Sequence, residues 1–91
     1  MEHFSWDPEK NEKLKTERRV SFEDIFYSIE RGFLLDTVDH PSKEKYPHQR
    51  IFVVLVNNYV YLVPFVEDKD GVFLKTIIPS RKATKQYLKG G

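Results

Sequence analysis

The chain has 91 residues, which suits a single domain over residues 1–91, and it contains no cysteine, which excludes disulfides, cysteine-ligated zinc and thiol catalysis. No apolar run approaches the ~20 residues of a membrane span and the N-terminus lacks a signal-peptide core, so we expect a cytoplasmic protein. The net charge of +1 excludes a strongly basic chain, but the segment from Lys75 to Gly91 has five lysines or arginines and no acid, which predicts a local basic patch.

Two helices are predicted in the N-terminal third, after a short strand at Phe4–Trp6. The first spans about Pro8–Arg18, because proline suits the first helical position and an aspartate before it can cap the free amides. The second begins after Ser21, which has an acidic residue three positions later as in a capping box, and Gly32 ends it. Its apolar residues recur at helical spacing and predict a core-facing side, made of Phe22, Ile25, Phe26 and Ile29.

The remainder of the chain predicts four strands and a last helix. Asn57-Asn58 suits a two-residue hairpin turn, because asparagine tolerates positive φ. Pro64 cannot donate to a ladder, so its strand is expected to have an edge or a bulge there. The expected strands are Phe33–Leu35, Arg50–Val56, Tyr59–Val66 and Val72–Ile78, with a loop at Asp36–Pro47, a turn at Glu67–Gly71 and a helix capped by Ser80 over about Arg81–Lys89.

The order of these elements is β-α-α-β-β-β-β-α. Consecutive strands joined by short turns favour an antiparallel meander, with the helices packed on one side. The sequence therefore predicts an α+β fold with two N-terminal helices on one side of a sheet and a short C-terminal helix.

The last predicted helix is the first candidate site. Arg81, Lys85 and Lys89 recur at every fourth position and form one basic stripe, with Lys82 beside it. Arginine and lysine bind phosphate, arginine in a bidentate manner. The alternative is a solvated face whose cations complement the C-terminal end of the helix dipole, and spacing alone favours this simpler interpretation.

Two further groups could take part in chemistry. Tyr61 and Lys75 belong to predicted strands, where tyrosines beside lysine could stack bases and bind phosphates, although tyrosine is also a common strand former. His48 enters the central strand beside Arg50, which is a good place for a positioned proton donor. His40 falls in the predicted loop and is interpreted as a surface residue.

Several chemistries lack their signatures. The three histidines form no metal-binding spacing, and there is no P-loop, dinucleotide fingerprint or nucleophile elbow. We therefore expect no metal and no cofactor.

Three blocks resemble the BrnT family of type II toxins, which is similar to RelE in fold. They are Phe4-Ser5-Trp6-Asp7-Pro8-Glu9-Lys10-Asn11, Val20-Ser21-Phe22-Glu23-Asp24 and Ile77-Ile78-Pro79-Ser80-Arg81-Lys82-Ala83-Thr84. Two positions depart from the family pattern. Glu17-Arg18-Arg19 stand where the family often has Lys-His-Gly, and Thr76 stands where it often has arginine.

The resemblance implies a ribonuclease toxin of a toxin–antitoxin pair, in a hetero-oligomer with a cognate antitoxin that carries a DNA-binding domain. Such an endoribonuclease needs no metal when the RNA 2′-hydroxyl attacks the adjacent phosphate. Arg81 and Lys82 would then neutralise the phosphorane, with Arg50 or Lys75 assisting and His48 donating the proton. The expected RNA-binding residues are Lys75, Lys85, Tyr61 and Tyr87, and the Pro64 strand would offer the antitoxin an edge.

Two alternatives remain open at this point. The same basic helix could belong to a non-catalytic module that binds nucleic acid or a partner, and such a module would show salt-sensitive binding with unchanged RNA length. A toxin homologue that has lost its activity could also persist as a protein-binding subunit.

Overall fold

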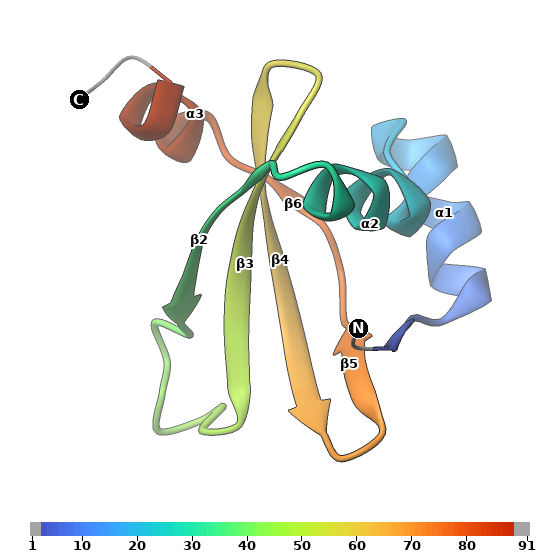
Figure 1. Ribbon diagram of the computed structural model, residues 1–91, viewed down its shortest axis with the longest axis vertical. Helices are drawn as coiled ribbons and strands as arrows, with labels where there is room; N and C mark the ends of the chain where they lie inside the picture. The colour runs from blue at the N-terminus through green and yellow to red at the C-terminus, as the bar shows by residue number, and fades with distance from the viewer. Residues whose placement is uncertain (1–2, 89–91) are drawn as a thin grey trace.

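A computed structural model describes residues 3–88 of the chain. Within them an α+β fold combines three helices with a mixed six-stranded sheet (Figure 1). The elements are β1 (Phe4–Ser5), α1 (Pro8–Arg18), α2 (Phe22–Glu30), β2 (Leu34–Asp39), β3 (Gln49–Val56), β4 (Tyr59–Asp68), β5 (Gly71–Leu74), β6 (Ile78–Pro79) and α3 (Arg81–Leu88).

The two N-terminal helices begin where the sequence predicts, because their starts are encoded locally. Asp7 accepts a hydrogen bond from the Glu9 amide at the start of α1, with proline in the first turn. Ser21 and Asp24 form a reciprocal capping box at the start of α2. Arg19, in the left-handed conformation, ends α1 and turns the chain into α2.

The sheet has the strand order β1-β5-β4-β3-β2, and β6 pairs with the start of β4. All pairs are antiparallel except β1 with β5, so the predicted antiparallel meander is wrong at this one edge. The exception arises because the N-terminal strand reaches the sheet beside the last hairpin. Gly71, at φ +136°, makes this approach possible, since a Cβ there would collide with the His3 carbonyl.

Two strand boundaries differ from the prediction. Residues Asp36–Asp39, expected in a loop, extend β2, because they pair with β3 from Val53 to Arg50. The predicted strand Val72–Ile78 divides into β5 and β6, with Lys75–Ile77 between them. Asn57 and Asn58 form the predicted hairpin turn, with φ values of 50° and 65°.

Pro64 lies in an interior strand, so of the two predicted alternatives the edge is wrong and the bulge is confirmed: residues 63–64 of β4 lie opposite the three residues 75–77. β4 pairs with β3 along its length, and Pro64 faces Ile51 there. On its other side β5 and β6 are interrupted, and the Lys75 amide donates to the Pro64 carbonyl at 2.8 Å. The missing proline N–H is therefore accommodated by the break between two short strands rather than by an exposed edge.

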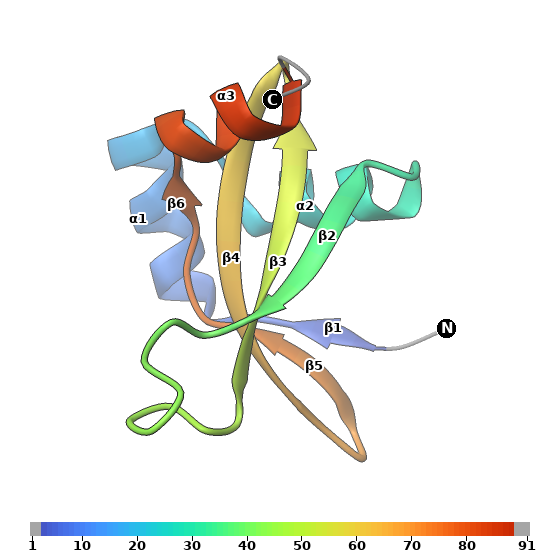
Figure 2. The ribbon, with the colours of Figure 1, turned by 90° about the vertical axis from the view of Figure 1, so that its left-hand side faces the viewer.

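The helices lie on both faces of the sheet, as Figure 2 shows with α3 in front of β3 and β4 and with α1 and α2 behind them. The prediction that all helices lie on one side is therefore wrong for α3. The main core lies under α1 and α2 and contains Phe22, Ile25, Val54, Val63 and Leu74. A smaller core under α3 contains Val53, Val60 and Ala83, with Leu35, Leu62 and Tyr87 packed against it.

Candidate functional site

The cationic side chains of α3 face solvent because its other side is fixed to the sheet. Ala83 is buried in the smaller core and Tyr87 packs against it. Arg81, Lys82 and Lys85 project from the opposite side of the helix and are exposed. Among residues 3–88 no ion pair involves any of these three cations. We call them the α3 cation face; the predicted stripe member Lys89 lies outside the described residues.

Hydrogen bonds hold α3 in one orientation. The Ser80 amide donates to the Val60 carbonyl at 3.1 Å, and the Val60 amide donates to Thr84 Oγ1 at 2.9 Å. Ser80 Oγ accepts from the Ala83 amide and caps the helix. At the other end the Tyr87 hydroxyl donates to Asp36 Oδ2 on β2 at 2.9 Å. This hydrogen bond to a carboxylate is the main cause that raises the pKa of Tyr87.

Thr84 is the central residue of this anchor, and a Thr84→Val variant tests it. Valine keeps the shape but removes the acceptor of the Val60 amide, so we expect a loss of about 1–2 kcal/mol in the free energy of unfolding. Urea denaturation followed by circular dichroism measures this loss. Lys85→Ala, on the outer side of the same helix, is the control and should stay within about 0.5 kcal/mol of the parent. Equal stability of Thr84→Val and the parent would show that the bond from the Val60 amide to Thr84 does not stabilise the attachment of α3.

The three cations are exposed, as a solvated face requires, but Arg81 and Lys82 stand in the first turn of α3, where the dipole does not favour them. Cations complement the C-terminal end of a helix, but these two lie at the positive N-terminal end. Their position opposes the helix dipole at a cost of about 0.3–1 kcal/mol each. Of the cations in the described part of α3, Lys85 alone lies in the last turn, where the dipole favours it.

Arg50 and His48 lie far from the α3 cation face. Helix α3 is anchored at Val60 on β4, and Val60 pairs with Leu55 on β3. Arg50 lies on β3 five residues before Leu55. That separation is about 16 Å along the strand. Arg50 also points to the opposite face, where it lines a hollow of ≈ 460 Å³ with Phe52 and Phe65.

The surroundings of Arg50 and His48 also differ from those of α3. Arg50 Nε approaches Asp39 Oδ1 at 3.9 Å. His48 is exposed in the turn just before β3. The structure therefore does not bring the four predicted catalytic residues together: Arg81 and Lys82 form one group, and Arg50 and His48 lie at the other end of the sheet.

The remaining predicted residues divide between the two faces. Lys75 is exposed and its ammonium lies 5.7 Å from the centre of the Phe73 ring. Phe73 pairs with Val66, and Val66 is on the same side of β4 as Val60. Because Lys75 contacts the Phe73 ring, it lies on the face of the sheet that α3 covers. Tyr61 lies on the other side, against the main core and in edge contact with Tyr59. Partial burial raises the pKa of Tyr61.

Arg18 is a neighbour of this region that sequence reasoning did not select. Its guanidinium, at the end of α1, donates a hydrogen bond to the Ile77 carbonyl, just before β6 and α3. The contact joins residues 59 positions apart in the chain. One feature of the sequence could have drawn attention to Arg18: it stands where the family pattern often has histidine.

No helix within residues 3–88 is long and apolar enough to cross a membrane. No group of three or more His, Asp or Glu side chains in the described part is placed to hold a metal ion. No family model, no curated protein and no solved structure matches this chain.

Proposed function

We propose that the protein is a metal-independent endoribonuclease toxin of BrnT type with a RelE-like fold, and that the first turn of α3 binds the RNA phosphate. The observation that carries this proposal is the position of Arg81 and Lys82 at the positive end of a helix dipole, exposed and without ion pairs among the described residues. Two exposed cations in the first turn, at the positive end of the helix dipole, favour an anion there. Lys85 extends the positive surface along α3, whereas Lys75 lies beside Pro64, about 13 Å along β4 from the Val60 that anchors the helix.

Contacts between the three resembling blocks support the proposal. Trp6 stacks on Phe22 with ring centres 5.7 Å apart, and the Asn11 side chain accepts from the Phe22 amide. Arg18, between the first two blocks, bonds to the third through the Ile77 carbonyl. The first two blocks therefore build the scaffold, and the third supplies the exposed cations.

The proposed reaction uses the RNA 2′-hydroxyl as nucleophile. Its oxygen attacks the adjacent phosphorus, its proton passes to water, and the bond from phosphorus to the 5′-oxygen breaks to leave a 2′,3′-cyclic phosphate. Arg81 stabilises the charge on the phosphorane, and it stays charged throughout. We assign to the Lys82 ammonium the proton that the departing 5′-oxygen takes up, in place of His48, which lies too far away.

The proposed partner is an antitoxin that neutralises this surface. An acidic segment would complement the α3 cation face, which the RNA also needs, so binding of the two would be mutually exclusive. An added strand could not use Pro64, which is interior. Among the described strands β2 pairs only with β3, so its outer edge is the longest place where a partner strand could pair.

A non-catalytic RNA-binding module is the second candidate, and one observation favours it. The described histidines lie away from α3: His40 and His48 in or beside the loop between β2 and β3, and His3 beside Val72. No imidazole among residues 3–88 can therefore transfer a proton at the α3 cation face. This module would bind RNA as strongly as the toxin but would leave its length unchanged.

The decisive experiment incubates the purified protein with a structured RNA in EDTA, beside the variant Arg81→Ala. We expect discrete fragments ending in 2′,3′-cyclic phosphate from the parent, at least about 100-fold slower cleavage by the variant, and no cleavage of a DNA strand of the same sequence. If the parent protein binds the RNA without cleaving it, the protein is the non-catalytic RNA-binding module and not a ribonuclease toxin. Cleavage that EDTA abolishes would point to a metal nuclease.

A further inference from the structure

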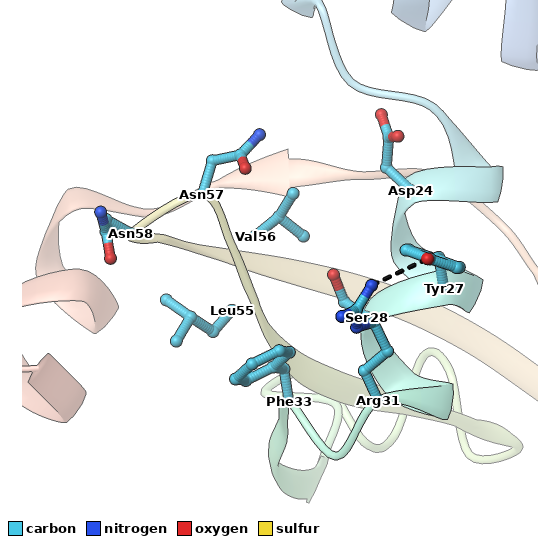
Figure 3. A pocket seen from close by; sticks show the side chains of 9 residues that line it. All are labelled: Asp24, Tyr27, Ser28, Arg31, Phe33, Leu55, Val56, Asn57 and Asn58. Atoms are coloured by element: carbon cyan, nitrogen blue, oxygen red, sulfur yellow. Dashed lines mark hydrogen bonds between the residues drawn. The ribbon is translucent and has the colours of Figure 1, made fainter.

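A second recess lies between α2 and the turn that joins β3 to β4 (Figure 3). Its volume is ≈ 450 Å³, which falls within the range of small-ligand sites, about 300–1,000 Å³. One wall is made by Tyr27 and Arg31 of α2, and the opposite wall by Asn57 and Asn58 of the turn. Phe33 closes one end. We call this recess the α2–turn hollow.

Two aromatic rings in the hollow are unusually accessible. Tyr27 is 61% exposed and Phe33 is 44% exposed, although both belong to large residues that a fold normally covers. Arg31 holds the Tyr27 ring in place, because its guanidinium lies 5.0 Å from the ring centre and donates to the hydroxyl at 2.8 Å. The ring is thus held in one orientation with Arg31 over one face, so a ligand would stack on the other face.

The polar groups of the hollow select a neutral, planar ligand. Its charged side chains are one carboxylate, Asp24, and one guanidinium, Arg31, so their formal charges cancel. A phosphate would be repelled by Asp24, whereas a nucleobase carries no charge. The amides of Asn57 and Asn58 each offer a donor and an acceptor, which suits the hydrogen-bonding edge of a base.

The hollow is close to the α3 cation face along the chain. Asn58 is two residues from Val60, whose amide and carbonyl both bond to the start of α3. Two residues span at most about 7 Å, so the turn lies close to the sheet-facing side of α3. The α3 cation face is on the outer side of this helix, about 10 Å farther across it. One single strand can therefore cross the turn, with phosphates at α3 and a base in the hollow.

We infer that the α2–turn hollow binds one unpaired nucleobase of the RNA strand whose phosphates lie on the α3 cation face. This inference rests on the proposed function, because it needs RNA at α3. It adds a contact that reads the base rather than the backbone, and it predicts a preference for single-stranded over double-stranded RNA.

The test compares two labelled RNA octamers that cannot be cleaved because each 2′-hydroxyl is methylated. One is complete, and the other lacks its central bases while keeping every phosphate. We expect the parent protein to bind the complete strand about tenfold more tightly in fluorescence anisotropy, as one stacked base contributes. Tyr27→Ser should remove that difference and leave the affinity for the abasic strand unchanged.

Matched variants make the outcome interpretable. Tyr46→Ser removes another exposed tyrosine, in the loop before β3, and should keep the tenfold preference. Asn57→Gly removes a second group of the hollow while suiting the positive φ of the turn, so it tests the site even if Tyr27→Ser fails to fold.

The two proposals fail in different ways. Equal binding of both octamers by the parent, weakened by Arg81→Ala, would overturn the base site and keep RNA binding at α3. Tyr27→Ser and Asn57→Gly that both retain the preference would also overturn it, and the exposed rings would then suit a protein contact instead. No binding of either octamer by the parent would overturn the proposed function together with this inference.

Discussion

Replacing Arg81, Lys82 and Lys85 together with alanine is expected to weaken RNA binding about 100-fold at low salt, with little change in stability. The three cations are exposed and have no ion pairs within the described residues, so their removal breaks no internal contact. Each phosphate contact to a single strand contributes about 0.7 to the slope of log affinity against log salt concentration. The variant should therefore lower that slope by about 2, as measured by anisotropy titrations over a series of salt concentrations.

A second triple variant with the same change in net charge shows whether RNA affinity depends on the α3 cation face or only on the overall charge of the protein. Lys13, Lys45 and Lys69 are exposed on α1, in the loop before β3 and in the turn between β4 and β5. Their joint replacement by alanine should change affinity only a few-fold and leave the slope close to that of the parent. Similar losses in both triple variants would refute a phosphate site at α3. Urea denaturation should show that both remain folded, since exposed substitutions change stability little.

The second large effect is expected from Asn11→Ala, which should reduce the free energy of unfolding by about 3 kcal/mol. Asn11 is a residue of α1 that is only 3% exposed, and its side chain contacts the start of α2. Its Oδ1 accepts from the buried Phe22 amide at 2.7 Å, and its Nδ2 donates to Glu23 Oε1 at 2.7 Å. Alanine leaves the Phe22 amide without this partner, and a domain of this size should melt about 15 °C lower.

The loss of stability in Asn11→Ala should also depend on pH, because Asn11 bonds to the carboxylate of Glu23 as well as to the Phe22 amide. The hydrogen bond from Asn11 is the main cause that lowers the pKa of Glu23 below 4.5. A lowered pKa in the folded state means that Glu23 stabilises the fold fully above pH 4.5, and that this contribution disappears as the pH falls through the lowered value. The gap between Asn11→Ala and the parent should therefore narrow in acid.

Thermal melts at a series of pH values measure this gap. Lys13→Ala, on the exposed side of α1, should match the parent at every pH. A gap that is constant with pH would show that only the bond to the Phe22 amide matters. A melting temperature of Asn11→Ala equal to that of the parent would show that Asn11 does not stabilise the junction of α1 and α2.

The candidate site could be predicted from sequence only in part. The spacing of Arg81 and Lys85 placed both on one side of a helix, and the exposed α3 cation face has that arrangement. The joint site with Arg50 and His48 could not be tested by spacing, because it depends on which face of β3 each residue occupies and on where α3 docks. Arg18 and Tyr27 were missed for the same reason: one bonds 59 residues away and the other lies off the apolar face of its helix.

Local sequence determined the elements whose signals lie within a few residues. The capping box at Ser21, the proline start of α1 and the turn at Asn57-Asn58 each follow from side-chain bonds or φ preferences that need no other part of the chain. The tertiary structure alone decided that β1 joins β5 in parallel, that Pro64 is interior and that α3 crosses to the second face. Such choices depend on register and docking, in which a shift of one residue moves every side chain of a strand to the other face.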